Sequence, residues 1–180
     1  MNEQSLFERF NVSPLLNSLA DRIAMSETQK SPFQIFLQHL NGSVPAFVLQ
    51  TIFTNEKTNQ WNHIVVLNDA EEAAYFFNSI ESVTEAMDLF YFPSSFKTPH
   101  NFNFLNPSHV MLRTEALTKI SMGGNKKIIV TYPEALFEKV ILPKTLQKNI
   151  IQIKTNDSID LNAMMQQFTC LLYTSPSPRD

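Results

Sequence analysis

The chain has 180 residues, 43% of them hydrophobic and 17% charged, and its 14 Lys and Arg against 17 Asp and Glu give a net charge of -3. This composition is typical of a globular protein and excludes a disordered chain. The mildly acidic balance argues against direct binding of DNA or RNA. Because no apolar run is long enough for a membrane span, the start lacks a signal peptide and Cys170 is the only cysteine, we expect a cytoplasmic protein.

The first third of the chain alternates helical and strand-like patterns. Its predicted elements are a helix over residues 1–25, a strand over 33–40, a helix over 44–53 and a strand over 63–68. Asn41-Gly42-Ser43 is a turn signal between the first strand and the second helix, and Pro45 fits the first turn of that helix.

The middle of the chain continues this alternation. Its predicted elements are a helix over residues 70–80, a strand over 89–92, a loop over 94–105, a helix that starts after Asn106, a strand over 127–131 and a helix from Pro133 to about Val140. Asp69 is the expected N-cap of the first of these helices, with Glu72 in the capping-box position. Gly123-Gly124 should end the helix that follows Asn106. The pattern predicts an α/β fold with a mainly parallel sheet flanked by helices.

The end of the chain differs from the rest. After Pro143 the pattern restarts with a predicted strand over residues 150–154 and a helix over 160–168, which predicts a domain boundary near Pro143. The last eleven residues, CLLYTSPSPRD, resemble the translation of a sequencing adapter. We therefore expect native sequence to end near Thr169 and give Cys170 and Arg179 no functional role. The expected divisions are residues 1–142, 143–169 and 170–180.

Asn41-Gly42-Ser43 lies where a phosphate-binding loop would lie, between a predicted strand and a helix. Such a loop needs further glycines, a lysine for the phosphates and a Ser or Thr for magnesium, and none of these follows Gly42 at the required spacing. We therefore interpret this segment as an ordinary turn at a degenerate P-loop position. Gly123-Gly124 precedes a strand, so a helix C-cap explains it.

Acidic, histidine and aromatic residues are the other candidates for a site. Asp69, Glu71 and Glu72 follow a predicted strand, where parallel sheets often carry active sites, but helix capping accounts for them. The histidines lack metal-ligand spacing; they are His39, His63, His100 and His109. The aromatics of residues 90–104 lack a basic groove, which favours packing or a protein-contact surface over nucleic-acid stacking. We predict no catalytic, cofactor-binding or metal-binding residue.

Four stretches in order resemble one protein family. They are VVLNDAEEAAYFFNSI (residues 65–80), LFYFPSSFK (89–97), LRTEALTKI (112–120) and IIVTYPEALFEKVI (128–141). Together they resemble the N-terminal region of bacterial transcription-repair coupling factor (Mfd), in its Bacteroidetes branch. The resemblance covers roughly residues 37–168.

The resemblance implies a UvrB-like, helicase-like domain that has lost its P-loop, followed by the truncated start of the UvrA-binding subdomain. The full-length family member is an ATP-dependent translocase on double-stranded DNA that removes stalled RNA polymerase at lesions and recruits UvrA. ATP and magnesium belong to its downstream motor, so this fragment is expected to be no enzyme and to bind no cofactor. The family's UvrA-contacting residues lie beyond Phe168, and none is assigned here.

Two alternatives stay open. The chain could be the start of UvrB itself or of another ATP-dependent DNA helicase, although the missing lysine and the missing Ser or Thr after Gly42 count against this. It could also be a stand-alone α/β interaction protein, if the reading frame stops near Thr169.

Overall fold

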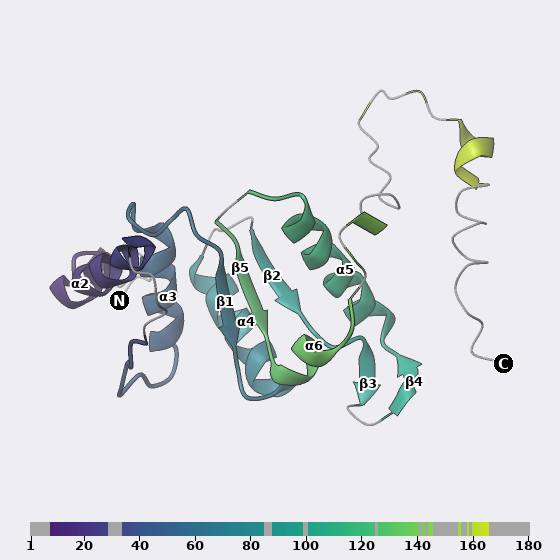
Figure 1. Cartoon of the computed structure of the whole chain (residues 1–180). Coiled ribbons are helices and arrows are strands. Elements are labelled where there is room, and N and C mark those ends of the chain that lie inside the picture. Colours follow the sequence, from purple (N-terminus) through teal and green to yellow (C-terminus); the bar gives the residue numbers. More distant parts are fainter. Residues whose placement is uncertain are drawn as a thin grey trace. The chain divides into compact units, whose positions relative to one another are not determined.

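The computed structural model contains a three-stranded parallel sheet (Figure 1). The strands are β1 (His63–Val66), β5 (Ile128–Thr131) and β2 (Leu89–Phe92), with β5 in the middle. Val66 of β1 and Phe92 of β2 both pair with Thr131 at the carboxyl end of the sheet. The prediction of an α/β fold with a parallel sheet is confirmed.

The structure describes residues 8–28, 34–84, 88–98, 101–124, 126–140, 142, 144–145, 155, 158 and 160–165. The chain divides into two compact units, Met1–Val140 and Ile141–Asp180, and the sheet belongs to the first. In the second unit residues 161–165 are helical, within the helix predicted over 160–168. His100, Cys170, Arg179 and the predicted strand over 150–154 lie outside the described residues. Among the described helices, none has the length and apolar character needed to cross a membrane.

Helices cover β5 and β2, whereas Ile64 and Val66 of the edge strand β1 are exposed. Three helices pack around the sheet: α3 (Val44–Thr54), α4 (Ala70–Val83) and α5 (Pro107–Ser121). α4 packs on β5 and β2 and against α3, whereas α5 packs on β2. Ile128, Ile129 and Val130 are all buried, so the central strand is covered on both faces, as parallel strands usually are. The main core includes Ala73, Ile80, Phe90, Phe92, Ala116 and Ala135.

The amino-terminal helices pack on α3 and make a second apolar cluster. α2 (Pro14–Ala24) continues into a short 3-10 helix, η1 (Met25–Thr28). The buried residues of this cluster are Leu16, Leu19, Val48 and Ile52. The prediction of one continuous helix over residues 1–25 is wrong at its centre: residues 8–11 are helical, but the chain leaves the helix at Val12 and Ser13. Pro14 has no N–H and restarts a helix at its first turn.

The strand predicted over residues 33–40 is also wrong: Phe33 lies outside the described residues, and residues 34–40 form neither strand nor helix. His39 has a φ of 61°, in the left-handed region, which interrupts an extended run. The segment pairs with none of the described strands. The Asn41-Gly42-Ser43 turn and the following helix, α3, were predicted and are confirmed.

The loop predicted over residues 94–105 is instead an antiparallel hairpin of β3 (Phe96–Thr98) and β4 (Asn101–Leu105). Phe96 pairs with Leu105, and the register shifts before Thr98. The last helix, α6 (Pro133–Phe137), is shorter than predicted, because Glu138 already has extended backbone angles.

Candidate functional site

The Asn41-Gly42-Ser43 turn leads directly into α3. The carbonyl of Asn41 accepts a hydrogen bond from the N–H of Val44 at 3.3 Å, and that of Ser43 accepts one from Ala46 at 3.0 Å. Gly42 has a φ of 59°, and an added Cβ would meet nothing within 4 Å. The glycine therefore serves the turn conformation and is not there to admit a close neighbour. The described segment before it, residues 34–40, supplies no strand, although a P-loop joins a strand to a helix.

The acidic residues before α4 act as its cap. The Asp69 carboxylate accepts a hydrogen bond from the N–H of Glu72 at 2.8 Å, which confirms the predicted N-cap. The Glu72 carboxylate reaches back to the backbone N–H of Asn68 at 3.1 Å and to its side-chain amide at 2.7 Å. The capping box is thus closed one residue earlier than its usual form, in which this carboxylate meets the N-cap N–H. Glu71 is exposed in the first turn, where the helix dipole favours it.

The described histidines are scattered. His39 is exposed, the Nδ1 of His109 lies 2.9 Å from the carbonyl oxygen of Ser94, and the Nε2 of His63 is buried without a hydrogen-bond partner. The His63 ring meets the ring of Phe53 edge-on at 5.7 Å between centroids. Within the described part of the chain, no three His, Cys, Asp or Glu residues come together in a way that could hold a metal ion.

A buried arginine holds together the carboxyl end of the sheet, and sequence reasoning missed it. Nη1 of Arg113, on α5, donates hydrogen bonds to the carbonyls of Pro93 at 3.0 Å and Ala135 at 2.9 Å. Nη2 donates to the carbonyl of Glu138 at 3.1 Å. The guanidinium carbon lies 4.1 Å from the centroid of the Phe92 ring, which adds a cation–π contact.

The carboxylate of Glu138 completes this network. Its Oε1 lies 3.4 Å from Nε of Arg113, and its Oε2 accepts hydrogen bonds from the hydroxyl of Ser94 at 3.0 Å and the N–H of Ser95 at 2.8 Å. The N–H of Ser94 donates to the hydroxyl oxygen of Tyr132 at 2.8 Å. The network ties the segment after β2 to the segments that flank α6.

Burial governs the titration of this network. It lowers the pKa of Arg113, against the opposing effect of the Glu138 carboxylate, and it raises the pKa of Tyr132. Burial, with Tyr132 nearby, also raises the pKa of Tyr91 to about 12. Both tyrosines therefore stay neutral near pH 7, and arginine keeps its charge there. Because the donors of Arg113 are directed at protein acceptors, the arrangement is suited to holding structure and offers no activated nucleophile or base.

One sequence signal marks Arg113. It lies three residues after Val110, three before Ala116 and four before Leu117, and therefore on the side of the helix that these apolar residues form. A charged residue in the apolar stripe of a helix is either exposed at its edge or buried with partners. The structure shows the second case, with a side chain only 5% exposed.

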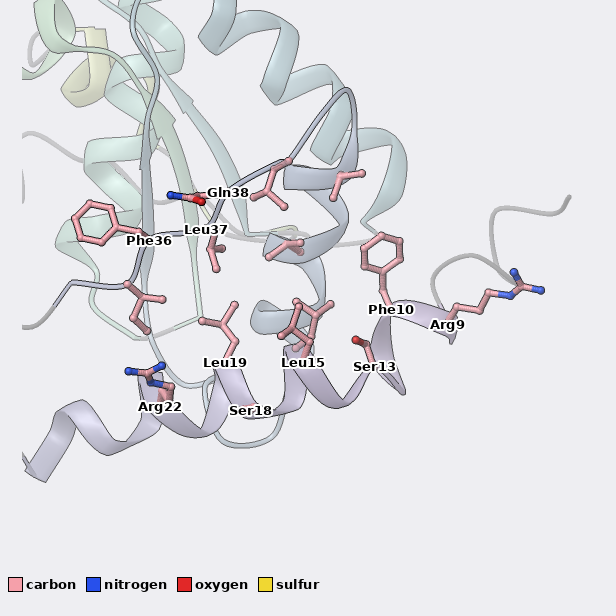
Figure 2. A pocket seen from close by; sticks show the side chains of 15 residues that line it. Arg9, Phe10, Ser13, Leu15, Ser18, Leu19, Arg22, Phe36, Leu37 and Gln38 are labelled. Atoms are coloured by element: carbon pink, nitrogen blue, oxygen red, sulfur yellow. The ribbon is translucent and has the colours of Figure 1, made fainter.

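The described residues also form a cavity of about 620 Å³ (Figure 2). It lies between α2, residues 35–40 and the start of α3. Its lining is mostly apolar and includes residues of the second core cluster and their neighbours. The two charged residues of the lining are Arg9 and Arg22. Its size is in the range of ligand-binding pockets. None of the candidate residues from the sequence lines it.

Together these features describe an α/β protein whose parallel sheet ends in a closed polar network. In sequence, the chain is similar to the transcription-repair-coupling factor of Rickettsia typhi (strain ATCC VR-144 / Wilmington), with 31% identity over 83 residues. The match covers 43% of this chain and 7% of that protein, so it spans less than a tenth of the relative's length. No protein-family model matches the chain. No solved structure matches it either.

Proposed function

We propose that the chain is the N-terminal scaffold module of a bacterial transcription-repair coupling factor. The observation that carries this proposal is the 31% identity to such a protein over 83 residues. The parallel sheet covered by helices is consistent with the UvrB-like, helicase-like domain expected there. In this proposal the module positions other parts of the protein and performs no chemistry.

The degenerate P-loop position supports a role without nucleotide. The turn at Gly42 has one glycine, no lysine within the motif and no preceding strand among the described residues. A backbone cradle for phosphates needs several glycines and a lysine. We propose that ATP and magnesium bind only to a motor further along the full-length protein. Its partners would be double-stranded DNA, stalled RNA polymerase and UvrA, all in the cytoplasm.

The reading frame of the source genome tests the assignment directly. DNA sequencing through the codon for Thr169 should reveal a frame that continues and that later encodes a complete G-x-x-x-x-G-K-[ST] motif. The adapter-like residues 170–180 should be absent from that frame. A genuine stop codon at this place would reject the proposal and favour the stand-alone interaction protein.

Nucleotide binding separates the scaffold from the helicase alternative. We expect isothermal titration of the chain with Mg-ATP to give no binding heat up to about 1 mM nucleotide, because the phosphates find neither a lysine nor a glycine-rich loop. If heat is seen, the Ser43→Ala variant shows whether the turn is responsible. Micromolar binding that this variant weakens would overturn the proposal in favour of UvrB or another ATP-dependent helicase.

A further inference from the structure

The cavity beside α2 is an open groove with an apolar floor. Leu16 and Leu19 of α2 and Val48 of α3 are buried beneath it, and Leu40 and Val44 pack against them. Figure 2 shows the labelled side chains of α2 on one side of the space and those of residues 36–38 on the other. On α3 this second cluster is covered by α2, by the helical residues 8–11 and by the irregular residues 34–40. A cavity of about 620 Å³ remains between them.

The rim of the groove exposes large apolar side chains. Leu15 is 77% exposed, Phe36 is 80% exposed and Leu37 is 48% exposed, and all three line the cavity. Single exposed apolar residues are common on protein surfaces. Several around one concave apolar space are typical of a surface that binds another molecule.

The charged residues that line the groove are all positive. Arg9 and Arg22 lie at its opposite ends, and its lining includes no acidic residue (Figure 2). Asp21, the neighbour of Arg22, pairs instead with Lys57. The described residues offer no ion-pair partner for Arg9 or Arg22. In a chain with a net charge of -3, this is a local positive site that favours an acidic ligand.

We propose that this groove binds an amphipathic helix with acidic flanks from a partner protein. α2 has 11 residues and is therefore about 16 Å long, which suits three turns of a helix laid beside it. Apolar residues at helical spacing would enter the groove between α2 and Phe36, and acidic residues at the two ends of the helix would meet Arg9 and Arg22. An extended ligand paired to residues 34–40 is disfavoured, because the left-handed His39 interrupts that segment. The proposal does not depend on the coupling-factor assignment.

A synthetic peptide tests the chemistry of the ligand. The probe is a fluorescein-labelled 15-residue peptide with Leu on one helical face, Glu flanking it and Ala elsewhere. Two control peptides have Lys in place of Glu, or the same composition in an order that disperses the Leu residues. We expect fluorescence anisotropy with the full chain to give micromolar binding of the probe and at least about tenfold weaker binding of both controls.

Surface variants locate the site without disturbing the core. Phe36→Ala and Arg22→Glu should each weaken binding of the probe about five- to tenfold. The matched controls are Phe137→Ala, on the 89% exposed Phe137 of α6, and Lys119→Glu, on the exposed end of α5; they should leave binding unchanged.

Four results would overturn the proposal. They are no binding of the probe at about 1 mM, equal binding of the Lys peptide, equal binding of the dispersed peptide, and equal weakening by the control variants. Sedimentation would identify a different occupant: a concentration-dependent dimer that Phe36→Ala abolishes would mean that a second copy of the chain fills the groove.

Discussion

Arg113 lies at the centre of the polar network at the carboxyl end of the sheet. It satisfies backbone carbonyls at three places and faces a carboxylate that is itself mostly buried. Removing one member of a buried ion pair leaves the other charge without compensation, which costs more than the pair contributes. We expect Arg113→Met to lower the free energy of unfolding by about 3 kcal/mol in urea denaturation.

Two further variants serve as controls for this expectation. Lys119→Met changes an exposed cation on the same helix and should alter stability by less than about 0.5 kcal/mol. Adding Glu138→Gln to Arg113→Met should recover part of the loss, because it removes the uncompensated carboxylate. Additive losses in the double variant would show that the two side chains are not coupled.

His63 is the described residue best placed to make stability depend on pH. Burial lowers the pKa of His63 from 6.5, against an opposing hydrogen bond with the Thr58 backbone. The unfolded chain therefore binds a proton more readily than the folded one, so this contribution to stability is complete above pH 6.5 and decreases as the pH falls below it. We expect the Tm to fall as the pH is lowered from about 6.5 to 5.

The His63→Phe variant separates this effect from general acid sensitivity. It keeps a ring beside Phe53 and removes both the titrating group and the unpartnered buried Nε2. Thermal unfolding of the variant should depend less on pH than that of the parent chain. His39→Gln, at an exposed position, should keep the parent's dependence; an unchanged pH profile in His63→Phe would assign the effect to other groups.

At the scale of elements, the turn before α3 should behave as a structural feature. Gly42 has a left-handed φ of 59° in open space, so a Cβ adds backbone strain without a clash. We expect Gly42→Ala to cost about 1 kcal/mol in urea denaturation, and Gly42→Asn to cost less, because Asn adopts this conformation more readily. If Gly42→Ala left stability unchanged, the turn would not be restrained by α3.

Elements with their own local signals were predicted well from the sequence. β2 has the predicted bounds, Leu89–Phe92, and α4 starts at its predicted N-cap because Asp69 and Glu72 satisfy its first N–H groups. The hairpin of β3 and β4 was missed, although Asn101 to Phe104 alternates polar and apolar residues with the period of a strand. Its asparagines and the nearby prolines had favoured a loop.

The failures arose where distant contacts decide the local conformation. The apolar run before Asn41 has the composition of a strand, but the described segment finds no strand partner and passes through a left-handed His39. α6 ends early as Glu138 turns toward Ser94 and Arg113, more than twenty residues away in sequence. The groove could not be predicted from the sequence either, because it forms only when α2, residues 35–40 and α3 are in their folded positions.

At the scale of the whole molecule, the described apolar side chains of the two units differ in burial. The first contains the sheet and both core clusters. In the second, Leu161 and Met165 are 66% and 64% exposed, and Lys144 and Thr145 are exposed near its start. Exposed apolar side chains such as these contribute little free energy against local opening.

We therefore expect limited trypsin digestion to cut first at Lys144, before any site within the sheet, and to leave a fragment of residues 1–144. Cleavage requires local opening, which costs least where few apolar contacts hold the backbone. Arg113 is an internal control, because it is buried and its bond should be cut only after global unfolding. Mass spectrometry identifies the fragment, and urea denaturation should give it the stability of the full chain. Equal protection at Lys144 and Arg113 would mean that the second unit is held as firmly as the sheet.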